Sequence, residues 1–388
     1  MSSSHSNDRL PIVPLLILAM GAFVTILTEA LPAGLLPQLA VGLNISESLA
    51  GQTITIYAIG SLLTAIPLTN TTQRVRRKPL LLIALAGFAL TNLITTLSTS
   101  YLLTMVARFL AGVSAGLLWA LLAGYATRMA PEHLKGRAIA IAMLGTPLAL
   151  SLGVPAGTYL GQLFGWRMAF GVMSIFAIIL VVWGSLTLPD FAGQAKDKHI
   201  SLKQVFILPG VRPILFTVLS FVLAHNLLYT YIAPFLTLAD LAKNTDIILL
   251  IFGCLSLFSI FITGVLIDQY SRLLTLYSII LFGFSALLLA VMGNQAVPVY
   301  VAIAIWGIAF GGAATLFQTA LAKTANDMMA DIAQSMLVTV WNIAIAGGGI
   351  IGGFLLSNFG VHTFPFVILI LLAFTFIVVW RAKQYGFR

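Results

Sequence analysis

Long runs of residues without a charged side chain constrain this chain more than any other feature. Of its 388 residues 8% are charged, against roughly 25% in an ordinary soluble domain. A helix that crosses a bilayer needs about 20 mainly apolar residues. The uncharged runs are long enough for that, and the last two have room for two helices each: 138–166, 168–189, 213–239, 247–267, 273–322 and 332–380. We therefore expect an all-α, polytopic membrane protein.

Turn residues and charge clusters divide the chain into twelve expected spans. They lie near residues 12–35, 49–70, 79–99, 101–126, 137–159, 166–188, 213–236, 246–267, 273–292, 297–321, 332–356 and 362–381. Lysine and arginine concentrate in the cytoplasmic loops of membrane proteins. With a cytoplasmic N-terminus, 17 of the 20 basic residues fall inside, Arg167 and Lys243 fall outside, and Arg108 lies within a span. This distribution predicts that both termini are cytoplasmic, and it assigns the net charge of +9 to a basic face beside anionic lipid.

Three local patterns recur at one offset of 195 residues, which indicates an internal duplication. The matched positions are Arg77 and Arg272, Gly112-x-x-x-Gly116 and Gly307-x-x-x-Gly311, and Gly157 and Gly352. A single glycine pair would indicate only close helix packing. Two six-helix halves in the same orientation, with a site between them, are typical of parallel-repeat transporters. We expect an N-terminal half at 1–188, a cytoplasmic linker at 189–212 and a C-terminal half at 213–388.

Glu29 and Arg108 are the formally charged side chains inside the expected spans. A charge at the bilayer centre costs at least about 2.5–3.5 kcal/mol on insertion scales, so both are functional candidates. Burial favours a neutral carboxyl and a nearby guanidinium favours a charged one, so bringing the two together or apart would change how Glu29 holds a proton. Pro32 frees the carbonyl of Thr28 for a proton, a water or a substrate. The alternative is a static ion pair between two helices.

A polar and aromatic group lies near the middle of the seventh span: His225, Asn226, Tyr229 and Tyr231. His225 and Tyr229 are four residues apart and so share a helix face. The other candidates for a cavity between the halves are Trp119, Trp306, Gln318, Trp341 and Asn342. Aromatic rings with a few amides suit an uncharged or amphiphilic organic solute. Taken singly, each of these residues is better explained by packing.

Basic loops follow the second and the eighth spans. The first contains Arg77, and the second runs from Gly264 through Asp268 to Arg272. Basic groups there can bond helix C-terminal carbonyls or Asp268 and hold one conformation closed, or they can belong to a solvated loop. The sequence has no phosphate-binding loop, metal-ligand spacing or nucleophile–base pair. We therefore expect no enzyme activity, cofactor or metal.

Over essentially the whole chain, these patterns resemble the major facilitator superfamily. Segments 73–78 and 264–272 are similar to its cytoplasmic gating motif, although the first copy has Thr69 and Gln73 where glycine and aspartate are usual. Gating is therefore better assigned to the second copy. Arg108-x-x-x-Gly112-x-x-x-Gly116 resembles the span-four motif that neighbours the proton site.

Further motifs resemble the antiporters of that superfamily. Its span-five signature is matched by Gly145, Gly153, Pro155 and Gly157, with the usual Gly-Pro pair split by Val154. Thr28-Glu29-x-x-Pro32 and Gly165-Trp166-Arg167 are similar to the drug/proton antiporter branch, which includes bacterial sugar, purine-nucleoside and arabinose-type efflux proteins.

The resemblance implies a monomeric, proton-coupled exporter of a sugar, nucleoside or amphiphilic drug in the bacterial cytoplasmic (inner) membrane. The resemblance also implies a fold of twelve helices in two pseudo-symmetric halves. The partners it implies are a small-molecule substrate, protons and the lipid bilayer, with no nucleic acid. A proton-independent facilitator, an uptake symporter and a non-transporting receptor or scaffold stay open as alternatives.

Overall fold

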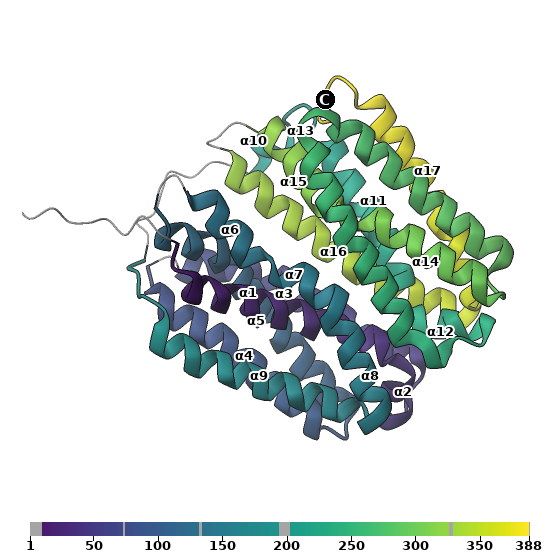
Figure 1. Cartoon of the computed structure of the whole chain (residues 1–388), viewed down its shortest axis with the longest axis horizontal. Coiled ribbons are helices and arrows are strands. Elements are labelled where there is room, and N and C mark those ends of the chain that lie inside the picture. The colour runs from purple at the N-terminus through teal and green to yellow at the C-terminus, as the bar shows by residue number, and fades with distance from the viewer. Residues whose placement is uncertain (1–9, 73, 132–133, 194–201, 326–328, 388) are drawn as a thin grey trace, which may run out of the picture.

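The computed structural model describes residues 10–72, 74–131, 134–193, 202–325 and 329–387, which form helices joined by short turns (Figure 1). Eleven segments of these residues are long and apolar enough to cross a membrane. The remaining expected span is α3 (Glu47–Thr72), a 26-residue helix that contains Pro67. The all-α fold with twelve membrane helices is confirmed.

The N-terminal half contains the first six spans. Its elements are α1 (Ile12–Gly34), α2 (Leu36–Leu43), α3 (Glu47–Thr72), α4 (Arg77–Leu97), α5 (Tyr101–Met129), α6 (Lys135–Met143), α7 (Gly145–Leu148), the π-helical turn η2 (Ala149–Gly153), α8 (Val154–Phe164) and α9 (Trp166–Thr187). The fifth span is thus four consecutive elements rather than one helix. Pro155 lacks the N–H that would bond the carbonyl of Ser151, which explains why regular helix is interrupted by η2.

The C-terminal half repeats this arrangement. The expected linker contains the short helix α10 (Leu202–Phe206). The elements of the C-terminal half are α11 (Val211–Thr230), α12 (Ile232–Leu236), η3 (Thr237–Ala239), η4 (Ala242–Asn244), α13 (Thr245–Met292), α14 (Ala296–Gly311), α15 (Ala313–Thr324), α16 (Ala330–Asn358), η5 (Val361–Thr363) and α17 (Phe364–Arg381). The eighth and ninth spans are both in α13, which is broken at Tyr270 (φ −127°, ψ 23°). Of the expected linker, residues 194–201 lie outside the described residues.

The same close helix contact occurs in both halves at the offset seen in the sequence. On α5, a Cβ added to Gly112 would collide with the backbone of Tyr57 in α3 and lie 2.9 Å from the Ser61 nitrogen. On α14, a Cβ added to Gly307 would lie 2.6 Å from the carbonyl oxygen of Phe252 in α13. The two contacts are equivalent, because Phe252 and Gly307 each lie 195 residues after their counterparts Tyr57 and Gly112. Glycine at these positions lets the helices approach closely.

The two halves meet along two seams. In one, α3 packs against α16, and in the other, η2 and α8 pack against α13. The ends of the halves that carry α2 and α12 lie together at one end of the bundle, opposite α10 and the C-terminus (Figure 1). We call this the α2/α12 end, and the charge distribution predicts that it is the outer one. The larger of the two apolar clusters includes residues of both halves.

Candidate functional site

Arg108 on α5 is held by three backbone carbonyls. Its Nη1 donates to the oxygen of Thr28 at 2.6 Å, its Nε to Thr53 at 3.2 Å and its Nη2 to Glu29 at 3.4 Å. The guanidinium carbon also lies 5.0 Å from the centre of the Tyr57 ring. Only 1% of Arg108 is exposed. Carbonyl dipoles and an aromatic face therefore solvate a charge that lies inside the bundle.

Pro32 in α1 explains why a backbone carbonyl is free to accept the shortest of these hydrogen bonds. Pro32 has no N–H, so the carbonyl of Thr28, four residues earlier, lacks its intrahelical donor. The sequence predicts that this carbonyl is open to a proton, a water or a substrate, whereas in the structure Arg108 occupies it. Asn92 on α4 fixes the same residue, because its Nδ2 donates to the Thr28 Oγ1 at 3.1 Å. Asn92 was not among the residues predicted from the sequence, although a buried amide in a membrane span always requires hydrogen-bond partners.

Glu29 is partly buried on α1 beside this arrangement. Among the described residues, no ion pair within 4.0 Å joins its carboxylate to Arg108, and the hydrogen bond between the two residues runs to the Glu29 carbonyl. The ion pair considered from the sequence is therefore not formed in this conformation. Arg108 donates three hydrogen bonds to backbone carbonyls, and the Glu29 carboxylate has no ion-pair partner within the described part of the chain.

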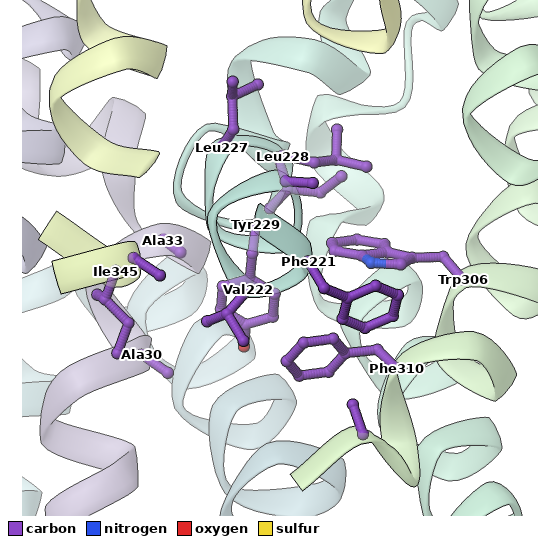
Figure 2. Packing of buried hydrophobic residues seen from close by; sticks show 14 of the residues in the cluster. Ala30, Ala33, Phe221, Val222, Leu227, Leu228, Tyr229, Trp306, Phe310 and Ile345 are labelled. Carbon is purple, nitrogen blue, oxygen red and sulfur yellow. The ribbon is translucent and has the colours of Figure 1, made fainter. Parts of the chain in front are cut away.

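A cluster of stacked rings fills the equivalent place in the C-terminal half. The His225 ring stacks on Phe310 with centroids 3.4 Å apart and planes 6° apart, and it lies 5.2 Å from Tyr229 and 5.1 Å from Trp306. Trp341 adjoins it, 6.2 Å from Phe310. We call these five residues the aromatic cluster. Figure 2 shows Tyr229, Trp306 and Phe310 among neighbouring apolar side chains.

Three polar atoms of the aromatic cluster have no hydrogen-bond partner among the described residues. They are Nδ1 of His225, the hydroxyl of Tyr229 and Nε1 of Trp306, and all three are buried. Leaving a buried polar group unsatisfied costs about 1–3 kcal/mol. Their gathering in one place gives the cluster a hydrogen-bonding capacity that the protein itself does not use.

The remaining polar candidates do not join the aromatic cluster. The amides of Asn226 and Asn342 donate to carbonyls of their own helices at 2.9 Å, and Asn226 packs against Gly348 of α16. Gln318 is exposed, and Trp119 packs at the edge of the apolar core of the N-terminal half. The structure thus brings together His225, Tyr229, Trp306 and Trp341 from the predicted set. The substrate-binding role assigned to all eight residues stays a prediction.

The second copy of the gating motif contacts the last helix. Arg272 Nη2 donates to the carbonyl of Trp380 at 2.8 Å, and its guanidinium lies 5.8 Å from the Trp380 ring. Gly264 is exposed, with open space where a Cβ would lie. The side chain of Asp268 lies outside the described part of the structure.

The first copy has an acidic partner that the sequence analysis missed. Asp190, just after α9, forms an ion pair with Arg76 at 2.6 Å and accepts from the backbone nitrogen of Lys78 at 3.2 Å. The backbone nitrogen of Arg77 donates to the Phe191 carbonyl at 2.9 Å. The start of the linker therefore binds the first turn of α4. Asp190 also places a carboxylate beside a loop that has Gln73 where the gating motif usually has an aspartate.

The residues that resemble the antiporter signature pack on the helix that carries Glu29. A Cβ added at Gly145, Gly153 or Gly157 would lie 2.6, 2.8 and 2.7 Å, respectively, from atoms of α1. Pro155 lies in the first turn of α8. Gly145 lets α7 approach the backbone of α1, and Gly153 and Gly157 leave room for the α1 side chains of Phe23 and Leu31. A shift of this segment would therefore reach α1 through direct contacts.

Comparison with known proteins agrees with this architecture. Residues 18–349 match the Major Facilitator Superfamily. Among solved structures, the chain is similar to a bacterial homologue of the human lysosomal transporter Spinster in an inward-facing, occupied conformation, with 14% identity, 96% of each chain covered and a TM-score of 0.79. The inward-facing, unoccupied conformation of such a homologue gives 13% identity, coverage of 97% of this chain and 98% of that one, and a TM-score of 0.72. Since the family match spans most of its length, the chain belongs to the Major Facilitator Superfamily, whose members are multi-pass membrane transporters.

Proposed function

We propose that this transporter exports a small, uncharged organic solute in exchange for protons. Membership of the superfamily makes it a secondary transporter that works by alternating access. The proposal for its coupling rests on one observation: the carboxylate of Glu29 lies inside the bundle without an ion pair to any described residue, while its neighbour Arg108 donates three hydrogen bonds to backbone carbonyls. An acid placed in this way can take up a proton from one side and release it to the other.

The packing around α1 supports the coupling role of Glu29. The segment that resembles the antiporter signature lies directly on α1, and α1 also contacts α11 and α13 of the other half. Rocking of the halves would therefore change the surroundings of Glu29, and with them its affinity for a proton. This supports the drug/proton antiporter branch over a proton-independent facilitator.

The aromatic cluster supports the proposed kind of solute. It offers ring faces, three unused hydrogen-bonding atoms and no carboxylate or ammonium group. A charged solute would lose its hydration there, and none of the five residues of the cluster has a carboxylate or ammonium group to pair with it. An uncharged ring-bearing solute, such as a sugar, a nucleoside or the apolar part of a drug, would satisfy those atoms and stack on the rings.

The coupling is tested with purified protein in proteoliposomes. A thermal-stability screen against sugars, nucleosides and amphiphilic antibiotics first identifies a stabilising solute, whose movement is then followed with and without a pH gradient. We expect the parent protein to move the solute against its own gradient when protons flow the other way. Glu29→Gln should still exchange labelled for unlabelled solute, because exchange needs no net proton transfer, but it should not accumulate solute.

Glu47→Gln is the matched control, because Glu47 opens α3 outside the expected span; it should couple like the parent. Full accumulation by Glu29→Gln would remove Glu29 from the mechanism. Transport by the parent that ignores pH would identify a facilitator, and solute that moves with protons would identify a symporter.

A further inference from the structure

Tyr231 occupies a slot between the two halves at the α2/α12 end of the bundle. It lies between α11 and α12 with non-helical backbone angles (φ −112°, ψ 28°), and none of it is exposed. The side chain belongs to the C-terminal half but reaches α3 of the N-terminal half. A large polar ring is thus buried at a boundary that has to open when the halves rock.

Hydrogen bonds around Tyr231 cross this boundary. The Tyr231 hydroxyl donates to the carbonyl of Gly349 at 2.8 Å. Gln52 Nε2, on α3, donates to that hydroxyl at 3.2 Å and to the same carbonyl at 3.1 Å. Ser48, one turn earlier on α3, donates from Oγ to the carbonyl of Gly353 at 2.9 Å. The side chains of α3 are thereby bonded to backbone carbonyls in a glycine-rich stretch of α16.

Glycines form the walls of the slot. A Cβ at Gly352 would lie 2.6 Å from the Tyr231 ring, a Cβ at Gly353 would lie 2.7 Å from its hydroxyl, and a Cβ at Gly51 on α3 would overlap the ring. Glycine inside a helix costs about 1 kcal/mol relative to alanine, so a run of them in α16 needs a structural reason. The fit of Tyr231 between these helices provides that reason for Gly352 and Gly353, since a side chain at either position would collide with the ring or its hydroxyl.

We propose that Tyr231, seated between Gly51 of α3 and Gly352 of α16, is a latch that holds the α2/α12 end of the transporter closed and leaves its slot whenever that end opens. All groups in the latch are neutral. Neutral hydrogen bonds contribute modestly and can be exchanged for bonds to water when the slot opens, so the latch can break and re-form in every cycle. Its closure depends on fit and hydrogen bonding, not on the charge of Glu29.

The latch is tested by the accessibility of Thr55, which is 4% exposed on α3 and packs against Gly349. Thr55→Cys is introduced after Cys254→Ser removes the single native cysteine, and the rate of maleimide labelling is measured on purified protein in detergent. Tyr231→Phe keeps the ring but loses the hydroxyl bonds to Gln52 and Gly349. We expect labelling to become roughly tenfold faster as the closed state loses about two neutral hydrogen bonds. Gly352→Ala should also accelerate labelling, because its methyl group displaces the ring.

Two matched controls separate the latch from general loosening. Tyr101→Phe removes a tyrosine hydrogen bond, to the carbonyl of Leu49, that lies within the N-terminal half. Gly283→Ala adds a methyl group in α13 where no atom lies within 4 Å. Both should label at the parent rate. Parent-rate labelling in Tyr231→Phe would overturn the proposal, and this variant alone decides if Gly352→Ala does not fold. Because the measurement involves neither protons nor solute, it stands apart from the test of Glu29.

Discussion

At the scale of single residues, the geometry of Arg108 matters as much as its charge. Three bonds leave its planar guanidinium in different directions, to Thr28, Thr53 and Glu29. Lysine carries the same charge on one compact ammonium and cannot reproduce this fork. Each hydrogen bond to a charged group contributes about 1.5–3 kcal/mol. We expect Arg108→Lys to lower the free energy of unfolding by at least the contribution of one such hydrogen bond, about 1.5–3 kcal/mol, and to slow transport. The loss of stability is measured by thermal unfolding in detergent.

The control for this substitution is Arg128→Lys. Arg128 bonds a single backbone carbonyl, that of Ala192, at 2.7 Å near the end of α5. One bond can be replaced by an ammonium, so this variant should unfold like the parent. If Arg108→Lys were equally stable and fully active, only the charge of Arg108 would matter and its three carbonyl bonds would have no role.

The charged residues of the site could be predicted from the sequence, but their contacts could not. A charge in a membrane span is conspicuous, so Glu29 and Arg108 are easily found. The partners of Arg108 are backbone carbonyls, which every residue carries, and nothing in the sequence marks Thr53 as a partner. From the sequence, Tyr231 is only one aromatic residue of the seventh span. Its packing could not be predicted, because the glycines that surround its ring are 120 or more residues away from it.

At the scale of helices, the approach of α7 to α1 depends on one glycine. A Cβ at Gly145 would collide with the carbonyl oxygen of Ala19 and lie 2.6 Å from the nitrogen of Phe23, and backbone atoms cannot rotate away. Overpacking of this kind costs about 1–3 kcal/mol. We expect Gly145→Ala to lower the thermal unfolding temperature and to slow exchange of solute.

Gly124→Ala on α5 provides the comparison, because a Cβ there meets no atom within 4 Å. Alanine is favoured over glycine in a helix by about 0.5–1 kcal/mol, so this variant should be unchanged or more stable. Gly145→Ala should therefore lower the thermal unfolding temperature, whereas Gly124→Ala should leave it unchanged or raise it. A stabilising Gly145→Ala would show that α7 does not lie against α1 in the membrane.

The order of the helices could be predicted from the sequence, whereas the positions at which they are interrupted could not. Length and apolar character are local properties, so the positions of the spans are recovered. The π-helical turn η2 lies inside the fifth span, and nothing in the length or apolar character of that span marks it. The segment around Tyr270 is polar enough to predict a loop, whereas in the structure the eighth span passes into the ninth at a kink with one non-helical residue.

At the scale of the whole molecule, the duplication places two different sites at equivalent positions. In the N-terminal half, Arg108 lies over the ring of Tyr57. In the C-terminal half, His225 lies 5.7 Å from Phe252, which occupies the position equivalent to Tyr57. This region of the N-terminal half contains charged groups, and the corresponding region of the C-terminal half contains aromatic rings. This division fits a protein in which one half binds the proton and the other binds the solute.

The orientation of the whole bundle is the remaining prediction, and two exposed lysines test it. Lys243 precedes α13 and Lys323 ends α15, so three spans separate them and they must lie on opposite sides of the membrane. Because basic residues concentrate inside, Lys323 is expected in the cytoplasm and Lys243 outside. In the Cys254→Ser background, Lys243→Cys should react with an impermeant maleimide on intact cells, and Lys323→Cys only after permeabilisation. The opposite pattern would place the Tyr231 latch on the cytoplasmic side, and reaction of both on intact cells would contradict the three spans between them.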